Sequence, residues 1–226
     1  MNSEIILFDI NETVLDLSSL KPGFITAFAQ QDALSLWFSR LLHTSTVCIA
    51  TGVRSDFATL AAITLDNVAT YYKVTLSDKQ RTELLKGFAN LQAHSDIKPA
   101  LSKLKQHGFK TVAFSNSSSA LINQQIAQAD LAEYFDEVVS VESTGSFKPD
   151  ATVYQFVGQQ LGVAKENLRL VATHDWDTHG AMSQGLKAAY IARTAAFYNP
   201  LYLKPEIQGD NMLEIVEQII SAYKPA

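Results

Sequence analysis

The sequence predicts an α/β fold, in which a Rossmann-like sheet of parallel strands carries a helical cap inserted after its first strand. Two observations support this prediction. Short apolar runs alternate with segments whose apolar residues recur at helical spacing, and such alternation is typical of parallel strands joined by helical crossovers. One long interval near the N-terminus breaks the alternation, because its pattern is helical almost throughout.

Apolar runs are expected to form the strands of the sheet. Each run is short and continuously apolar, as in strands that helices cover on both faces. The runs are 4–9, 111–116, 137–143, 168–174 and 187–193. Helices are predicted between them by three- and four-residue apolar spacing, and the C-terminal part is expected to be a loop followed by a last helix. These segments are 97–107 and 151–161 for the helices, 200–211 for the loop and 212–223 for the last helix.

A helical cap is expected between the first strand and the rest of the sheet. Its helices are predicted by apolar periodicity in 33–42 and 57–72, and by a capping box formed by Ser77 and Gln80. The predicted division of the chain is 1–16 and 93–226 for the Rossmann-like core, and 17–92 for the cap.

The composition is that of an ordinary globular protein and argues against several classes of partner. Of the 226 residues, 47% are hydrophobic and 18% are charged, with a net charge of −5. Because no basic cluster is present, nucleic acid is not expected as a partner, and no apolar run is long enough to span a bilayer. The single Cys48 is expected to be a buried apolar residue. One cysteine and the absence of a secretory leader predict a cytoplasmic protein.

Polar residues follow the predicted strands, at the edge where open parallel sheets bind ligands. Asp9 and Thr13 follow the first strand. The others, after later strands, are Ser115, Asn116, Lys148, His174, Asp175 and Asp177. Each alone has an ordinary explanation, such as a helix cap or a turn residue. Because they converge on one edge of one sheet, together they predict a catalytic site.

These motifs resemble those of the haloacid dehalogenase superfamily, and within it the branch of type II 2-haloacid dehalogenases. The stretches that carry the resemblance are FDINETVLDL, AFSNSSS, FKPDATVY and ATHDWDTHGA. They are similar to the branch's nucleophile motif, its Ser-Asn motif, its Lys-Pro-x-x-x-x-Tyr pattern and its Trp-Asp-x-x-Gly-Ala pattern. The resemblance covers nearly the whole chain, including the cap.

The resemblance implies a hydrolase that works through an aspartyl ester, without a metal or another cofactor. Asp9 would attack the halogen-bearing carbon of a small carboxylic acid, and Asp177 would orient the water that hydrolyses the ester. Lys148 would keep Asp9 ionised, since a neighbouring positive charge lowers the pKa of a carboxyl group. Thr13 and Ser115 can donate hydrogen bonds that fix the carboxylate oxygens.

Several residues are expected to contact the substrate or the departing halide, namely Asn11, Phe38, Arg54, Asn116, Tyr154 and His174. Phe38 stands where the branch usually has an arginine, and Arg54 is a candidate for the same role. His174 stands where the branch has an asparagine, and a substrate contact, proton transfer or a structural hydrogen bond are all open to it. Tyr154 is expected near the lysine, and simple core packing is an equal alternative. Together these departures predict a changed substrate.

Two alternative functions stay open. An Mg²⁺-dependent phosphatase of small phosphate esters would bind its metal through Asp9, Asn11, Asp175 and Asp177. Against this alternative, Asn11 cannot act as a general acid, and Thr173 stands where such phosphatases have a metal-binding aspartate. The other alternative is an inactive protein that keeps the fold for binding, although the intact catalytic set argues against it. A small molecule is the expected partner, and a homodimer is possible.

Overall fold

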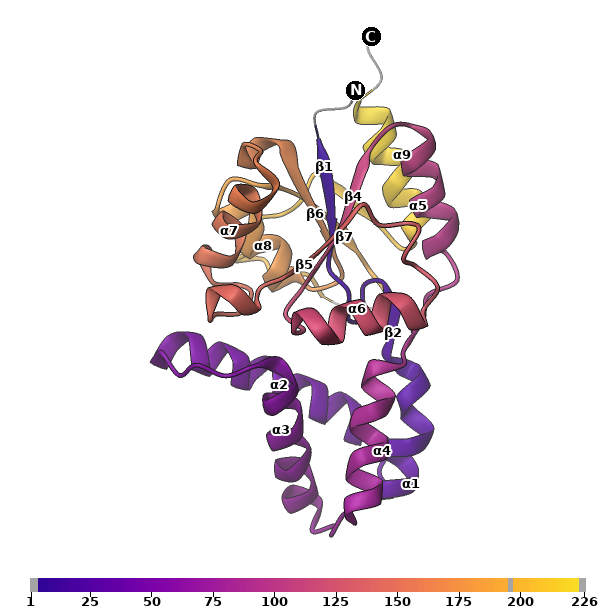
Figure 1. Ribbon diagram of the computed structural model, residues 1–226, viewed down its shortest axis with the longest axis vertical. Coiled ribbons are helices and arrows are strands. Elements are labelled where there is room, and N and C mark those ends of the chain that lie inside the picture. The colour runs from indigo at the N-terminus through magenta and orange to yellow at the C-terminus, as the bar shows by residue number, and fades with distance from the viewer. Residues whose placement is uncertain (1–3, 195–196, 224–226) are drawn as a thin grey trace.

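Strand β1 (Ile5–Phe8) lies at the centre of a parallel sheet in the computed structural model, which describes residues 4–194 and 197–223 (Figure 1). The other strands of this sheet are β4 (Lys110–Ser115), β5 (Glu137–Ser140), β6 (Leu168–Ala172), β7 (Lys187–Ile191) and β8 (Ile207–Gly209). Their order is β5-β4-β1-β6-β7-β8. Phe8 pairs with Ala113 of β4 and with Val171 of β6, so the chain leaves β1 between the ends of two neighbouring strands. The predicted α/β fold class is confirmed.

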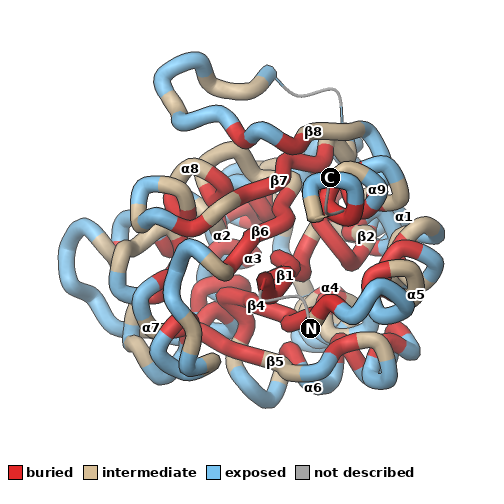
Figure 2. The backbone as a smooth tube through the Cα atoms, turned by 90° about the horizontal axis from the view of Figure 1, so that it is seen from above, coloured by how far each residue is buried: buried red, intermediate tan, exposed pale blue. Residues whose placement is uncertain are grey.

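Helices cover both faces of the sheet, as buried parallel strands require. They are α5 (Ile97–Gln106), α6 (Ser119–Gln128), α7 (Ala151–Leu161), α8 (Asp175–Ser183) and α9 (Met212–Ala222), with the short 3-10 helices η2 (Glu142–Thr144) and η3 (Lys165–Asn167). On one side of the sheet α5 packs against α9, and on the other α7 packs against α8 (Figure 1). Figure 2 shows that the buried residues are concentrated in the strands between these layers.

Strand β8 corrects one prediction, because it lies inside the segment that the sequence predicts to be a loop. Ile207 pairs with Ala189 of β7 and is buried. The strand escapes sequence reasoning because it is only three residues long, and its one apolar residue forms no recognisable run.

The residues between β1 and α5 form a helical unit at the carboxyl edge of the sheet (Figure 1). Its elements are η1 (Leu17–Leu20), α1 (Lys21–Phe28), α2 (Ala33–Thr51), α3 (Phe57–Tyr72) and α4 (Asp78–Ala89). Strand β2 (Leu15–Asp16) pairs antiparallel with β3 (Gln92–Ala93), so the two chain segments that connect the core with the helical unit lie side by side. The division at 17–92 stays a prediction, and this strand pair lies at both of its ends.

Helix α2 is longer than its predicted range of 33–42, because a buried face continues through Ser45 and Cys48 before Gly52 ends the helix. Cys48 is buried, as predicted. The capping box of Ser77 and Gln80 is present at the start of α4. Apolar periodicity therefore predicts that a helix is present at α2, but it does not predict where the helix ends.

Aromatic side chains form the core of the helical unit. Trp37 is fully buried, and its ring centroid lies 5.2 Å from that of Phe24 and 5.5 Å from that of Phe88. Its Nε1 donates a hydrogen bond of 2.9 Å to the carbonyl oxygen of Ala61 on α3. Trp37 therefore fixes the packing of α1, α2, α3 and α4 around one centre.

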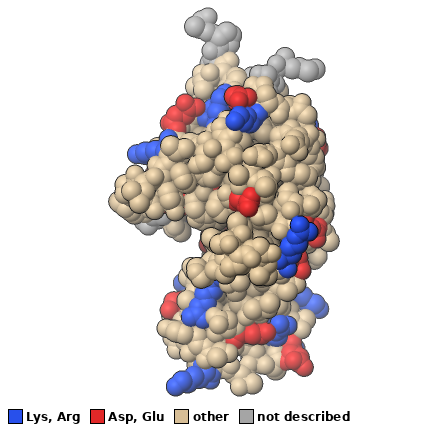
Figure 3. Space-filling model, turned by 90° about the vertical axis from the view of Figure 1, so that its left-hand side faces the viewer, with Lys and Arg blue, Asp and Glu red and all other residues tan. Residues whose placement is uncertain are grey.

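The surface in Figure 3 is hollowed between the core and the helical unit. On this face Lys and Arg side chains are scattered among Asp and Glu side chains and do not gather into one patch. Within the part of the chain that the structure describes, no helix combines the length and apolar character needed to cross a membrane.

Candidate active site

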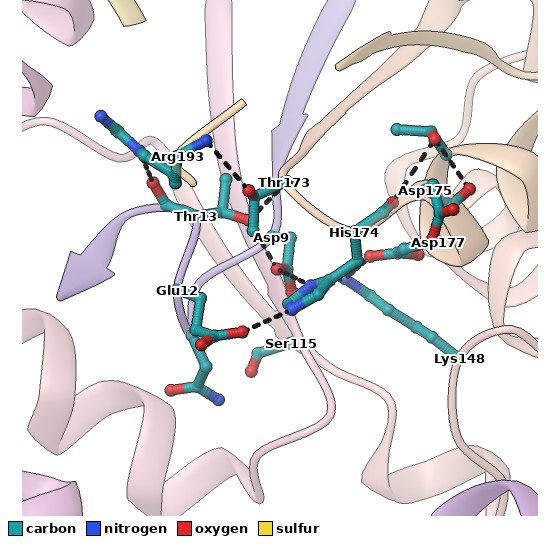
Figure 4. A network of polar contacts seen from close by, with 12 residues as sticks. Asp9, Glu12, Thr13, Ser115, Lys148, Thr173, His174, Asp175, Asp177 and Arg193 are labelled. Atoms are coloured by element: carbon teal, nitrogen blue, oxygen red, sulfur yellow. Dashed lines mark hydrogen bonds and ion pairs between the residues drawn. The ribbon is translucent and has the colours of Figure 1, made fainter. Parts of the chain in front are cut away.

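Asp9 directly follows β1, and two side chains hold its carboxylate (Figure 4). The hydroxyl of Thr13 donates a 2.7 Å hydrogen bond to Asp9 Oδ2, and the ammonium of Lys148 donates a 3.1 Å bond to Oδ1. The backbone N–H of Asp9 donates to the carbonyl oxygen of Val171 at 3.0 Å, which extends the sheet pairing by one residue. The predicted nucleophile is thus fixed on a rigid strand end with only 7% of the residue exposed.

Lys148 occupies the inner side of the site and uses all of its donors. Its Nζ donates to Asp9 Oδ1, to Asp177 Oδ2 at 3.0 Å and to the carbonyl oxygen of Phe114 at 2.8 Å. An ammonium group has three protons, so none remains for a ligand. The Lys148 backbone N–H is itself held, since it donates to Asn116 Oδ1 at 2.9 Å.

Asp177 lies behind Lys148 and is fully buried. Its Oδ1 accepts a 2.6 Å hydrogen bond from the hydroxyl of Tyr154, and its Oδ2 accepts the bond from Lys148. Gly180 makes this arrangement possible, because a Cβ at that position would lie 2.6 Å from the Tyr154 hydroxyl oxygen. Asp177 and Tyr154 therefore hold Lys148 in place from the side opposite to Asp9.

Electrostatics keep Asp9 ionised. Burial alone would raise the pKa of Asp9, but the positive charge of Lys148, the nearby His174 and the bond from Thr13 hold this pKa far below its ordinary value. Burial alone would lower the pKa of Lys148, but the carboxylates of Asp177 and Asp9 raise it. At neutral pH the pair is consequently a buried carboxylate beside a buried ammonium, and this charge state suits a carboxylate nucleophile.

His174 lies on the outer side of Asp9, between two carboxylates (Figure 4). Its Nε2 is 2.9 Å from Glu12 Oε2, and its Nδ1 is 3.3 Å from Asp9 Oδ2. The second contact has the distance of an ion pair without the alignment of a hydrogen bond. Burial lowers the pKa of His174, but Asp9 and Glu12 outweigh burial and raise it to about 10. His174 is therefore an imidazolium at neutral pH.

Glu12 has a left-handed backbone, with φ of 65°. For a residue with a side chain this conformation costs roughly 1–2 kcal/mol, so neighbouring groups must impose it. Its N–H donates to the carbonyl oxygen of Leu15 at 2.9 Å, and its own carbonyl oxygen lies 3.1 Å from His94 Nε2. Both contacts fix the turn after β1 and direct the Glu12 side chain toward His174.

Arg193, two residues after the end of β7, holds the same turn from another side. Arg193 Nε donates to the carbonyl oxygen of Thr13 at 3.1 Å, and Arg193 Nη1 donates to Asp96 Oδ2 at 2.7 Å. The Thr173 N–H donates to the Thr13 hydroxyl at 3.0 Å, which orients that hydroxyl toward Asp9. Arg193 and Thr173 thus act on the nucleophile only through Thr13.

A cavity of about 700 Å³ lies between the core and the helical unit, next to this network. Its wall includes Glu12, Phe38, His94, Tyr190, Arg193 and His174. Asp9 is not part of the wall, whereas Glu12 and His174 are, and His174 contacts both Glu12 and Asp9. A ligand in the cavity would therefore meet the Glu12–His174 pair before it meets Asp9.

Phe38 and His174 are the two expected substrate contacts that line the cavity. The placement of the other four differs from the expectation. Asn11 bonds Ser117 and Gln125, Asn116 bonds the backbone of Lys148, Tyr154 bonds Asp177, and Arg54 is an exposed residue beside Gly145. The three buried side chains are placed differently because each has hydrogen-bond partners within the protein. Arg54 is placed differently because it lies in the exposed segment that precedes α3.

Ser115 also differs from its expected role. It is fully buried, and its hydroxyl oxygen accepts a 3.1 Å hydrogen bond from the N–H of Ser117. Within residues 4–194 and 197–223, its hydroxyl makes no hydrogen bond to Asp9. Thr13 and Lys148 already hold the two carboxylate oxygens, so Ser115 shapes the turn after β4.

The residues expected to bind Mg²⁺ in a phosphatase do not form a cation site. Asp177 has both oxygens bonded to protein donors, the Asn11 amide is bonded to Ser117 and Gln125, and Asp175 Oδ2 accepts from the N–H of Asn199 at 3.1 Å. Across the described residues there is no group of three or more His, Cys, Asp and Glu side chains arranged to hold a metal ion. Lys148 supplies the positive charge that lies between Asp9 and Asp177.

Sequence reasoning missed four contributors to the site, namely Glu12, His94, Asp96 and Arg193. A signal was available for Arg193, because it ends the fifth apolar run, at the same sheet edge as Asp9. Glu12 lies inside the nucleophile motif, but its left-handed backbone cannot be read from the letters. His94 and Asp96 contact the site only because β3 crosses beside β2.

The sequence and the fold of this chain are similar to those of known dehalogenases. Residues 4–168 match a family model for haloacid dehalogenase-like hydrolases. The chain is 26% identical to an (S)-2-haloacid dehalogenase of Pseudomonas putida, with 98% of each chain covered. It is 23% identical to haloacetate dehalogenase H-2 of Moraxella sp. (strain B), with 96% of this chain and 97% of that protein covered. The structure of an L-2-haloacid dehalogenase from Xanthobacter autotrophicus has the same fold, with a TM-score of 0.87 at 20% identity over 96% of this chain and 98% of that chain.

Proposed function

Because the chain belongs to the haloacid dehalogenase-like hydrolases, we propose that it hydrolyses the carbon–halogen bond of a 2-haloacid through an ester on Asp9. The observation that carries the proposal is the buried Asp9 carboxylate, held ionised by Lys148 at 3.1 Å and oriented by Thr13 at 2.7 Å. Relatives that match nearly the whole chain are named for dehalogenation of such acids, which supports the proposal.

The reaction has two steps. An oxygen of Asp9 attacks carbon 2 of the substrate, a carbon–oxygen bond forms as the carbon–halogen bond breaks, and the halide leaves with the bonding electron pair. Water then adds to the carboxyl carbon of the ester, and the bond between this carbon and the ester oxygen breaks. The products are a 2-hydroxy acid, a halide ion and a proton, and the carboxylate of Asp9 is restored.

We assign the neighbouring residues by their contacts. Lys148 keeps Asp9 ionised before the attack and stabilises the charge that returns to it after hydrolysis. Thr13 fixes the orientation of the carboxylate. Asp177 and Tyr154 position Lys148, since their polar atoms are bonded to it or to each other. That Asp177 also orients the hydrolytic water stays a prediction.

The cavity favours a substrate with a side chain larger than methyl on carbon 2. Pockets of about 300–1,000 Å³ hold ligands of drug size, and the cavity here has about 700 Å³. A three-carbon haloacid would leave most of that volume empty. The proposed partner is therefore a small-molecule haloacid with an extended side chain. A homodimer stays a prediction.

Halide release from purified protein tests the proposal. We would compare 2-chloropropionate, 2-bromopropionate and 2-bromohexanoate, with and without EDTA, and measure phosphate release from an aryl phosphate beside them. Halide release that survives EDTA is expected, with the hexanoate as the best substrate. A single turnover in ¹⁸O-water should place the label in Asp9, because water attacks the ester on its carboxyl carbon. Phosphate release that requires Mg²⁺, without halide release, would overturn the proposal.

A further inference from the structure

A haloacid substrate carries a negative charge into a site that already contains several carboxylates. Asp9, Glu12 and Asp177 surround the reacting centre, and Figure 4 shows the first two converging on His174. Position 38 on α2 offers no compensating charge, because Phe38 occupies it. Binding of an acid therefore requires a positive group that faces the cavity and has a donor to offer.

The cations near the cavity differ in how they stand to Asp9. Lys148 has given its three protons to protein acceptors. Arg193 lines the cavity and its Nη2 has no protein partner among the described residues, but its Nε and Nη1 donate to Thr13 and Asp96, and it acts on Asp9 only through Thr13. Burial and the neighbouring Arg193 lower the pKa of His94, so its ring is neutral near pH 7. Lys21 also lines the cavity, from the exposed start of α1 in the helical unit.

His174 combines a place on the cavity wall with a direct contact to Asp9, and its side chain is 12% exposed. Its ring is stacked on Trp176 at a centroid distance of 5.1 Å, with the Phe38 ring at 6.3 Å on the cavity wall. These rings fix the plane of the imidazolium, so its Nε2–H points in one direction. In the structure that direction leads to Glu12 Oε2, at 2.9 Å.

The Glu12 carboxylate thus sits where an anionic ligand of His174 would sit. Its side chain is 39% exposed and lines the cavity, so it can turn toward solvent without losing a buried environment. Its backbone is held in the left-handed conformation by Leu15 and His94, and the turn would remain in place when the side chain moves. The Glu12 carboxylate can therefore leave His174 Nε2, and return to it, by rotation of its side chain alone.

We propose that the carboxylate of the substrate replaces Glu12 as the partner of His174 Nε2, so that His174 binds the acid group and Glu12 competes with the substrate for it. The carboxylate identity of the ligand rests on the proposed function. In this arrangement the acid group is held on the Nε2 side of the imidazole ring, while Nδ1, on its other side, stays 3.3 Å from Asp9 Oδ2.

Two substitutions test the proposal in opposite directions. Glu12→Gln removes the competing charge, so KM for the haloacid should fall by about fivefold or more while kcat stays within about twofold. His174→Gln removes the positive charge, and the loss of a charge-assisted contact should raise KM roughly 10- to 150-fold. A large loss of kcat in Glu12→Gln at unchanged KM would overturn the proposal, because the pair would then transfer protons in the reaction.

Binding of propionate and of propionamide, measured by calorimetry, gives a readout that needs no turnover. Propionate should bind more tightly to Glu12→Gln and more weakly to His174→Gln, whereas propionamide should bind the three proteins alike. His179→Gln on α8 and Glu133→Gln on the surface are the matched controls, since neither residue lines the cavity. Thermal unfolding checks that each variant is folded.

The outcomes separate this inference from the proposed function. If no haloacid releases halide but propionate affinity follows the two variants, the proposed function fails and the carboxylate site stands. If halide is released but neither variant changes the propionate affinity, the proposed function stands and His174 is not the residue that binds the acid group.

Discussion

Strand β1 has a buried ion-pair cluster at each of its ends, and the two clusters differ in what they leave open. At the amino end, Glu4 accepts hydrogen bonds of 2.6 Å from both Arg169 and Lys187. Arg169 also donates to the carbonyl oxygen of Ala188 at 3.2 Å and to Glu206 at 3.0 Å. Every charged group of this amino-end cluster therefore has a protein partner, and neither Glu4 nor Arg169 lines the cavity beside the Glu12–His174 pair.

The cluster at the carboxyl end is satisfied on one side only. Its inner half, Lys148 with Asp177, is closed by protein contacts in the same way as the amino-end cluster. Its outer half, Glu12 with His174, lies on a cavity wall and includes a left-handed residue. Buried charge alone thus does not distinguish a functional site from a structural ion pair. Backbone strain and an adjoining cavity distinguish the functional site from the structural ion pair.

The largest expected effect comes from removing the nucleophile. Asp9→Asn should lower kcat for halide release by at least about 10³-fold, because loss of a nucleophile removes the covalent route. Asp150→Asn is the matched control: Asp150 caps α7, and asparagine caps helices equally well. Steady-state halide release measures both variants. If Asp9→Asn and Asp150→Asn had comparable activity, the carboxyl-end cluster would have only a structural role, like the amino-end cluster.

A large effect on stability without an effect on chemistry is expected at the other end of β1. Arg169→Met leaves Glu4 buried with one remaining cationic partner, and breaking a buried pair in this way costs about 3–5 kcal/mol. Urea unfolding should show the loss, while kcat measured well below the unfolding transition should stay near that of the wild type. A fall in kcat that matches the loss of stability would mean that the two ends of β1 are coupled through the strand.

The two clusters also differ in how far the sequence predicts them. Asp9, Lys148 and Asp177 were identifiable because parallel strands deliver their C-terminal residues to one edge, and apolar runs locate those strands. Glu4 begins one of the same runs and Arg169 is the second residue of another, but a charged residue near a strand start reads as an ordinary surface position. The Glu12–His174 contact joins residues 162 positions apart, and it depends on a backbone angle that the residue type disfavours. Local patterns therefore predict the frame of the site and miss its strained part.

The smallest expected effect is a pH dependence of stability that belongs to the outer half of the carboxyl-end cluster. His174 has a pKa of about 10 in the folded protein, against 6.5 ordinarily. The groups that face it are Asp9 and Glu12, with Lys148 on the far side of Asp9. A raised pKa in the folded state means that the stabilisation is complete below pH 6.5 and disappears as the pH rises through 10.

Urea unfolding of the wild type and of His174→Gln between pH 6 and 10.5 isolates this contribution. The difference between their free energies of unfolding should be on the order of 2–4 kcal/mol at pH 6 and should shrink toward pH 10. His179→Gln is the control, because His179 does not contact the two carboxylates. A difference for His174→Gln that stays constant over this range would mean that folding does not raise the pKa of His174. The outer half of the cluster would then have no cation that can bind an acid. The two ends of β1 would differ only in that a cavity adjoins the carboxyl end.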